Sequence, residues 1–129
     1  MYALVIDDSI AMRSIISRIL KPAGFEILQG KHGGEGLERL AAHADDIGVV
    51  VVDWNMPEMD GLEFVKRVRA DAAYAGLKIV MVTTEGEPAR MAAALMAGVD
   101  EFLMKPFTED ALIGAMRLVG VTFPEACPA

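Results

Sequence analysis

Residues 49–61 read Val-Val-Val-Val-Asp-Trp-Asn-Met-Pro-Glu-Met-Asp-Gly, so four consecutive valines lead into an aspartate and a turn sequence. A continuous run of β-branched residues is typical of a strand that is buried on both faces of a parallel sheet. We therefore expect Asp53, which follows the last valine, to be held firmly at the rim of the core. An aspartate in this position can simply end the strand, or it can serve as a nucleophile or a metal ligand.

Four further apolar runs share this character, and they alternate with segments in which apolar residues recur at helical spacing. The runs comprise residues 3–6, 27–28, 79–82 and 102–104. The helical stripes comprise Met12, Ile15, Ile16, Ile19 and Leu20; Leu37, Leu40, Ala41 and Ala44; Leu62, Val65 and Val68; Met91, Ala94 and Leu95; and Leu112, Ile113 and Met116. This alternation predicts one α/β domain with a five-stranded parallel sheet and five helices on its two faces. We expect the domain to span residues 1–121 and residues 122–129 to form a short C-terminal tail with no output domain.

Several residues mark where the helices begin and end. Asp60 and Thr108 precede the third and fifth stripes, and both residue types are favoured as helix N-caps. Pro88 suits the first turn of the fourth helix, and Gly98 stands just past its expected end. These signals support the assignment of helices between the strands.

Composition excludes several classes of protein. The formal charge of −7 disfavours nonspecific binding to nucleic acid or to an anionic membrane, because both attract basic surfaces. The single cysteine, Cys127, can form no internal disulfide, which fits a reducing compartment. The N-terminal segment meets Asp7 and Asp8 before a signal peptide could form, and no apolar run is long enough to span a membrane. We expect a cytoplasmic protein, with a monomer as the default state.

Polar side chains follow four of the five predicted strands. They are Asp7 and Asp8 after the first strand, Asp53 and Asn55 after the third, Thr83, Thr84 and Glu85 after the fourth, and Lys105 after the fifth. Taken singly, each has an ordinary structural explanation, such as a helix cap, a turn residue or a solvated lysine. In an open parallel sheet, however, the carboxyl ends of the strands form one edge, and ligands bind there. We therefore expect these side chains to form one site, whereas residues 29–34, after the second strand, offer nothing comparable.

The chemistry of this group of residues points to a phosphoryl-transfer site. Clustered carboxylates repel one another unless a cation neutralises them, and oxygen ligands favour Mg²⁺, whereas zinc is disfavoured because no His or Cys follows these strands. A carboxylate can attack phosphorus to form an aspartyl phosphate, provided that positive charge and donors surround the phosphoryl oxygens. Mg²⁺, Lys105 and a threonine hydroxyl would supply them. No Walker or G-x-G-x-x-G sequence occurs, so we expect no nucleotide site.

Four segments of the chain match the motifs of a known family, in the same order. They are Val5-Ile6-Asp7-Asp8-Ser9 with Met12-Arg13; Asp53-Trp54-Asn55-Met56-Pro57 followed by Met59-Asp60-Gly61-Leu62-Glu63; Met81-Val82-Thr83; and Lys105-Pro106-Phe107-Thr108. On these motifs, nearly the whole chain resembles the receiver domain of bacterial two-component response regulators, and within that family the stand-alone receivers of chemotaxis. The resemblance implies a doubly wound, flavodoxin-like sheet in the strand order 2-1-3-4-5 and a cis peptide bond before Pro106.

The resemblance also implies which residues hold the phosphoryl group and the metal. Asp53 would be the phosphoacceptor. Asp7 and Asp8 would form an acid pair that holds Mg²⁺ together with Asp53 and the backbone carbonyl of Asn55.

A second set of roles concerns the switch. Thr83 would be the hydroxyl that moves to the phosphoryl group, and Lys105 would pair with the phosphoryl oxygens. Phe102 would be the switch aromatic residue, turning into the space that Thr83 vacates. Asn55 and Glu85 would flank the path of the attacking water and so tune the lifetime of the signal.

The function implied is that of a phosphorylatable switch rather than a conventional enzyme. A histidine kinase or a phosphotransfer protein would donate the phosphoryl group from a phosphohistidine, and the modified protein would bind a downstream protein, in chemotaxis or another pathway. The flagellar motor switch is a weaker expectation for that partner. Phe102 lacks the hydroxyl of the tyrosine that chemotaxis receivers carry, and residues 85–90 are more acidic than the corresponding lysine-bearing segment of those receivers.

Other functions compatible with a receiver are those of a phosphorelay intermediate, a phosphate sink and a degenerate receiver that only binds protein. An aspartate-nucleophile phosphatase is a further alternative. Such enzymes usually carry a second aspartate two residues after the nucleophile, as a general acid, and this chain has Asn55 there.

Overall fold

A computed structural model of the chain describes residues 1–56, 59–84 and 87–124. Five parallel strands form one sheet in the order β2-β1-β3-β4-β5, which confirms the order implied by the resemblance. The strands are β1 (Tyr2–Ile6), β2 (Glu26–Gly30), β3 (Ile47–Asp53), β4 (Ile79–Thr83) and β5 (Glu101–Met104). The helices are α1 (Ile10–Leu20), α2 (Gly33–Ala42), α3 (Gly61–Arg69), α4 (Pro88–Ala97) and α5 (Glu109–Leu118), with a short 3₁₀ helix, η1 (Ala72–Tyr74), that the sequence analysis did not predict.

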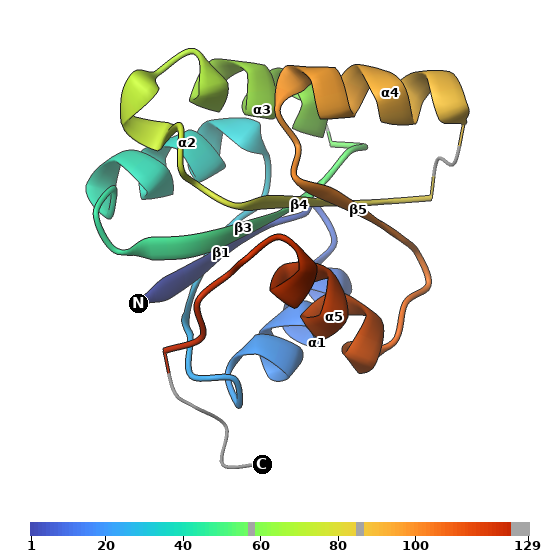
Figure 1. The fold of residues 1–129 in the computed structure, drawn as a ribbon. Helices are drawn as coiled ribbons and strands as arrows, with labels where there is room; N and C mark the ends of the chain where they lie inside the picture. Colours follow the sequence, from blue (N-terminus) through green and yellow to red (C-terminus); the bar gives the residue numbers. More distant parts are fainter. Residues whose placement is uncertain (57–58, 85–86, 125–129) are drawn as a thin grey trace.

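The helices cover both faces of the sheet. Helices α2, α3 and α4 lie on one face, and α1 and α5 lie on the other (Figure 1). Among the described residues, none of the helices has the length and apolar character needed to cross a lipid bilayer.

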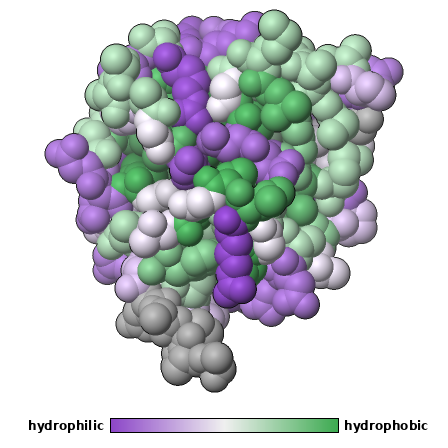
Figure 2. Space-filling model, in the orientation of Figure 1, coloured by the Kyte–Doolittle hydropathy of each residue, from purple (hydrophilic) through white to green (hydrophobic). Residues whose placement is uncertain are grey.

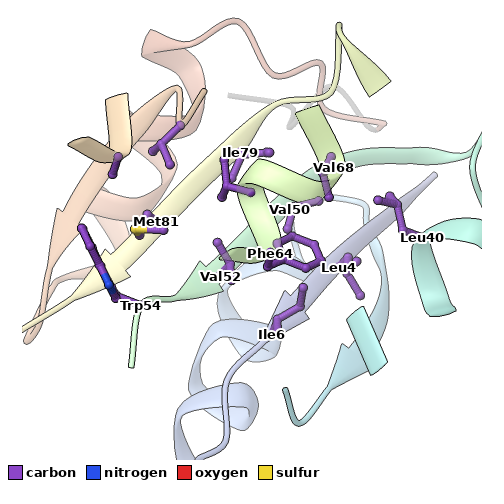
Figure 3. Close-up of a cluster of buried hydrophobic side chains, with 13 residues drawn as sticks. Leu4, Ile6, Leu40, Val50, Val52, Trp54, Phe64, Val68, Ile79 and Met81 are labelled. Atoms are coloured by element: carbon purple, nitrogen blue, oxygen red, sulfur yellow. The ribbon is translucent and has the colours of Figure 1, made fainter. Parts of the chain in front are cut away.

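The run of four valines in β3 is continuous rather than alternating because both faces of the strand are covered. Val50 and Val52 pack with Phe64 in the core under α2, α3 and α4, whereas Val49 and Val51 belong to the core under α1 and α5. Figure 3 shows the first of these cores, with Val50 and Val52 beside the Phe64 ring. Each valine is at most 1% exposed, so each contributes on the order of 1.5 kcal/mol or more of hydrophobic stabilisation. This packing on both sides fixes the end of β3, and with it the position of Asp53.

The helix ends follow the signals in the sequence. Asp60 caps α3 and Thr108 caps α5, each through a hydrogen bond from a backbone N–H three residues on to the side-chain oxygen. Pro88 is the first residue of α4, and Gly98 ends that helix with a φ of 116°, which only glycine adopts readily. The peptide bond between Lys105 and Pro106 is cis, as the resemblance implied.

The acid pair Asp7 and Asp8 does not cap the helix that follows it. Ser9, rather than Asp7 or Asp8, is the N-cap of α1, and its hydroxyl accepts a hydrogen bond from the N–H of Met12. The carboxylate of Asp7 instead accepts a hydrogen bond from the N–H of Ser9 itself. The acid pair is therefore available for other interactions at the sheet edge.

Arg69 joins the segment before β4 to the segment before β5. Its guanidinium donates hydrogen bonds to the carbonyls of Leu77 and Gly98, at 2.7 and 3.0 Å, and forms a 2.9 Å ion pair with Asp100. Asp100 also accepts a hydrogen bond from the N–H of Ile79, the first residue of β4. These contacts fix the alignment of β4 and β5, and hence the relative positions of the residues at their carboxyl ends.

Candidate functional site

The carboxyl edge of the sheet brings together side chains that are far apart in the sequence. Asp53 and Thr83 are the last residues of β3 and β4, and Asp7 and Lys105 directly follow β1 and β5. The N–H of Lys105 donates to the carbonyl of Thr83, at 2.8 Å, which extends the β4–β5 pairing by one residue. Asp7, Asp53 and Thr83 are buried, at 1%, 6% and 0% exposure, whereas Asp8 is exposed. A largely buried polar group thus lies at the rim that the sequence predicts for a ligand.

Lys105 bridges two of the carboxylates. Its Nζ lies 3.1 Å from Oδ2 of Asp7 and 3.3 Å from Oδ1 of Asp53. The lysine side chain is only 16% exposed, which is unlike a solvated surface lysine. This contact confirms that the ends of β1, β3 and β5 converge, because the partners are separated by 98 residues in one case.

Charge and burial shift the pKa values of Asp53 and Lys105. Burial raises the pKa of the Asp53 carboxyl, and the negative charge of Asp7 raises it further, against the opposing effects of Lys105 and of a hydrogen bond from the Asn55 backbone. Burial alone would lower the pKa of Lys105, but the hydrogen bond to Asp7 and the charge of Asp53 outweigh it, so the pKa is raised. The lysine therefore stays protonated at neutral pH, and negative charge remains in excess.

The donor set fits a divalent cation of the Mg²⁺ type. Asp7, Asp8 and Asp53 each offer a carboxylate oxygen, and these oxygens lie within 4.8 Å of one another. All three donors are hard oxygens, and the single positive charge of Lys105 does not balance them. Burial is the main cause of the raised pKa of Asp53, and repulsion by the charge of Asp7 adds to it. A bound cation would relieve the repulsion, and Mg²⁺ is typically held by one or two carboxylates with water completing its shell.

The other predicted site residues that the structure describes lie in different environments. Asn55 is exposed two residues after Asp53, and Thr83 is fully buried beneath the edge. Phe102 lies in β5 and is half-buried. Glu85, predicted to flank the path of the attacking water, lies outside the described residues, as does Cys127. The roles of Asn55, Thr83 and Phe102 stay predictions.

Two residues that the sequence analysis left without a role connect the switch position to α4. The Trp54 ring stacks on Phe102 with centroids 6.5 Å apart and planes at 20°. On α4, the Arg90 guanidinium lies 4.4 Å from the centroid of Trp54. Trp54 is 3% exposed and directly follows Asp53, so a rigid aromatic ring connects the phosphoacceptor strand to β5 and α4.

Arg13 is the buried charge for which sequence analysis predicted no role. It is 6% exposed on α1, and its Nη1 donates a hydrogen bond to the backbone carbonyl of Asp7. The nearest signal in the sequence is an arginine beside the apolar stripe of the first helix. That signal does not reveal which carbonyl the guanidinium reaches, because the carbonyl belongs to Asp7, outside the helix that carries Arg13.

The raised pKa of Asp53, caused by burial and by the charge of Asp7, predicts how this residue affects stability in the absence of divalent metal. Because the pKa of Asp53 is raised in the folded state, the ionised carboxylate destabilises the fold at neutral pH, and this penalty disappears as pH falls through the folded-state pKa toward the ordinary value of 3.8. We therefore expect Asp53→Asn to raise the melting temperature in EDTA at neutral pH. The gain over wild type should shrink on acidification. Lys105 keeps Asp7 as its partner in this variant.

Thermal unfolding followed by circular dichroism between neutral pH and pH values near 4 tests this expectation. Asp45→Asn, at an exposed position, is the matched control and should change stability by less than about 0.5 kcal/mol. A lower melting temperature for Asp53→Asn at neutral pH in EDTA would show that Lys105 outweighs burial and repulsion.

Comparison with known proteins agrees with the fold and with the family that the sequence resembles. The family model for the response regulator receiver domain matches residues 3–117. Chemotaxis protein CheY1 of Helicobacter pylori is 46% identical over 120 residues, which are 92% of this chain and 96% of that protein. A CheY homolog of Campylobacter jejuni is 47% identical over 113 residues, covering 87% of this chain and 86% of that protein.

Solved structures agree with these relatives. Chemotaxis protein CheY4 of Vibrio cholerae superposes with a TM-score of 0.84 at 35% identity, covering 92% of this chain and 97% of that one. The chain belongs to the response regulator receiver domain family and is closely related to the CheY regulators of chemotaxis.

Proposed function

We propose that this receiver accepts a phosphoryl group on Asp53 from a phosphohistidine and signals by binding a partner protein in the modified state. The donor would be a histidine kinase or a phosphotransfer protein, since receiver domains in general act with such donors. The observation that carries the proposal is the position of Lys105, whose Nζ lies within 3.3 Å of the carboxylates of Asp7 and Asp53 at the carboxyl edge of the sheet. A half-buried lysine placed between two acids can shift its hydrogen bonds to the phosphoryl oxygens when a phosphoryl group is attached to Asp53.

The residues of the site have distinct tasks in this transfer. An oxygen of Asp53 attacks phosphorus, the new O–P bond forms as the N–P bond breaks, and the freed imidazole nitrogen takes a proton from solvent. Lys105 donates to the phosphoryl oxygens from the position where it already contacts Asp53. Thr83, the last residue of the neighbouring strand, supplies a hydroxyl donor. Bound Mg²⁺, held by Asp7, Asp8, Asp53 and the carbonyl of Asn55, would supply positive charge that neutralises the phosphoryl oxygens.

Hydrolysis ends the signal and restores the starting carboxylate. Water attacks the phosphorus of the acyl phosphate and releases inorganic phosphate, with no further residue consumed. Asn55 and Glu85 would flank this path and set its rate. The protein is thus a signalling protein that promotes its own chemistry, and the phosphatase alternative is disfavoured because Asn55 cannot act as a general acid.

The output surface would be formed by α4, β5 and α5. Movement of Thr83 toward the phosphoryl group would leave room for Phe102 to turn inward, and the Trp54 and Arg90 side chains stacked beyond it would transmit the change to α4. Figure 2 shows apolar and hydrophilic side chains side by side on the face that carries these elements. The exposed apolar residues of α4, β5 and α5 include Leu95, Met96, Met104 and Leu118. Such a mixed surface suits a protein partner.

Metal removal tests the proposal directly. The protein is incubated with acetyl phosphate or phosphoramidate in Mg²⁺ and, in parallel, in excess EDTA. We expect an adduct that is stable in acid and labile in base, detected by intact mass spectrometry, with Mg²⁺ and little or none with EDTA. An absence of any adduct in Mg²⁺ would favour the degenerate receiver, and rapid turnover of unrelated phosphate esters would favour an enzyme.

A further inference from the structure

A cavity of about 270 Å³ opens between α1, β2 and α2, and Asp53 is not among the residues that line it. We call it the anion pocket, and its lining residues are Arg13, Gln29, Lys31, Glu35 and Arg39. Three of these five side chains are cations and one is a carboxylate. This balance is the reverse of that of the whole chain, whose formal charge is −7. The pocket therefore concentrates positive charge in an acidic protein.

Arg13 gives the pocket a fixed and buried donor. The residue is 6% exposed, its Nε donates to Oε1 of Gln29 at 2.9 Å, and its Nη1 donates to the carbonyl of Asp7. No acceptor within the described part of the chain bonds to Nη2, and no buried side-chain nitrogen or oxygen there lacks a partner. Nη2 is consequently reached by solvent, and Arg13 lines the cavity. Two hydrogen bonds thus orient a guanidinium whose remaining donors serve no other group.

The two other cations that line the pocket are Lys31 and Arg39. In the ranges that the structure describes, neither Lys31 nor Arg39 forms an ion pair, and both side chains are exposed. Glu35, the one carboxylate, is bound to the protein, because it accepts a 2.8 Å hydrogen bond from the N–H of Lys31. That hydrogen bond, with the charges of Lys31, His32 and Arg39, holds the pKa of Glu35 below its ordinary value. Glu35 therefore remains negative at neutral pH and opposes anion binding.

We infer that the anion pocket binds a small tetrahedral oxyanion, either inorganic phosphate or the phosphoryl end of a small phosphorylated molecule. The three cations come from α1, from the residue after β2 and from α2, so they can meet different oxygens of one anion. A planar carboxylate offers two oxygens in one plane and would satisfy fewer of them. The cavity holds a small anion rather than a protein segment. None of the three cations belongs to the acidic cluster, so the inference goes beyond the proposed function.

The test is a titration with inorganic phosphate in EDTA at constant ionic strength, followed by ¹H–¹⁵N correlation spectra. We expect saturable shifts of the amides of Lys31 and Glu35 and of the Nε–H of Arg13, with the amide of Asp53 little affected. The double variant Lys31→Ala/Arg39→Ala should weaken binding at least about tenfold, because two charged donors are lost. Arg18→Ala/Lys66→Ala removes the same charge from exposed positions outside the pocket and should bind as wild type does.

Glu35→Gln gives a prediction of opposite sign. The amide keeps an oxygen acceptor for the N–H of Lys31 but removes the negative charge from the pocket, so phosphate should bind about threefold more tightly. Weaker binding in Glu35→Gln, unchanged binding in Lys31→Ala/Arg39→Ala, or shifts centred on Asp53 and Lys105 would each overturn the inference.

Two further ligands separate the possible sources of the anion. Glycerol 3-phosphate that binds more tightly than inorganic phosphate indicates a phosphorylated small molecule, whereas equal or weaker binding indicates inorganic phosphate itself. If acetate binds as tightly as phosphate, the inference that the pocket prefers a tetrahedral oxyanion is overturned. Labelling of Lys31→Ala/Arg39→Ala by acetyl phosphate in Mg²⁺ should match wild type. The proposal for the anion pocket and the proposal that Asp53 is the phosphoacceptor can therefore be contradicted independently.

Discussion

Asp53→Asn is expected to lose the acyl phosphate adduct entirely. The amide of asparagine is isosteric with the carboxylate but is a poor nucleophile, so no O–P bond forms at this position. The strand itself should be undisturbed, because the four valines that hold it are packed in both cores. Intact mass spectrometry after incubation with acetyl phosphate and Mg²⁺ measures the outcome, and Tris-acetate blanks give the background.

Two further variants make the interpretation specific. Asp45→Asn has the same change of charge at an exposed position and should label as wild type does. Asp8→Asn keeps the nucleophile but removes an exposed carboxylate of the metal cluster, so its labelling should recover as the Mg²⁺ concentration is raised. If Asp53→Asn and wild type acquired the adduct equally, the nucleophile would have to be another residue, and peptide mapping would identify it.

Gly61→Ala is expected to lower both stability and phosphorylation. A Cβ at this position would lie 2.3 Å from the carbonyl oxygen of Asp53 and 3.0 Å from Cα of Trp54. Both contacts are with backbone, which cannot turn away as a flexible side chain can. The N–H of Gly61 also donates to the carbonyl of Trp54 at 2.8 Å, so the start of α3 lies directly against the phosphoacceptor strand. Relief of the clash requires that α3 or the end of β3 move.

The expected size is about 2 kcal/mol of destabilisation or more, which corresponds to a fall in melting temperature of roughly 6–10 °C. Under conditions where the variant is folded, its rate of labelling by acetyl phosphate should fall as well, because Asp53 is displaced from Lys105. Chemical denaturation and the initial rate of adduct formation measure the two effects. A variant that is less stable but labels at the wild-type rate would show that α3 moves and β3 does not.

Gly114→Ala is the matched control for this substitution. Gly114 lies within α5 and is exposed, and a Cβ there would meet no atom within 4 Å apart from its chain neighbours and the backbone of its own helix. Alanine at an unobstructed helical position stabilises by about 0.5–1 kcal/mol relative to glycine. We therefore expect the same chemical change to stabilise the protein at residue 114 and to destabilise it at residue 61. Destabilisation by both would indicate that overpacking at Gly61 is not the cause.

The elements were predictable because their signals are local. Val49 to Val52 are apolar and β-branched, so they could be assigned to a strand buried on both faces before any contact was known. Caps such as Asp60 and Thr108 act within a few residues of their own position. The short helix η1 was missed because residues 72–74 carry no apolar stripe, and the contacts of Arg69 with the carbonyls of Tyr74 and Leu77 hold that segment.

The composition of the candidate site was predictable for a related reason. A parallel sheet places all its carboxyl ends at one edge, so Asp7, Asp53, Thr83 and Lys105 could be grouped without a structure. Pairing within the group was not predictable. Which carboxylates Lys105 reaches depends on the register of neighbouring strands and on side-chain conformation, to within about an ångström.

Residues 29–34, at the end of β2 and just after it, show the opposite case. Residues 29–34 carry no feature that stands out in the sequence, yet Gln29 and Lys31 line the anion pocket with Arg13 and Arg39. These residues come from three separate elements, and only the packing of α1 and α2 against β2 makes them neighbours. The buried position of Arg13 is equally invisible in the sequence, because it depends on the carbonyl of Asp7, just after β1, and on the side-chain amide of Gln29 in β2.

The sequence by itself determined the alternation of strands and helices, the two-sided burial of β3 and the set of polar residues at the carboxyl edge, because these follow from periodicity, residue type and chain direction. The tertiary structure alone decided that Lys105 bridges Asp7 and Asp53, that Trp54 stacks on Phe102 beneath Arg90, and that Gly61 leaves no room for a side chain. Contacts of this kind join residues from different elements at distances of a few ångströms. The strand register and the packing of the helices set those distances, and neither is encoded in any single segment of the chain.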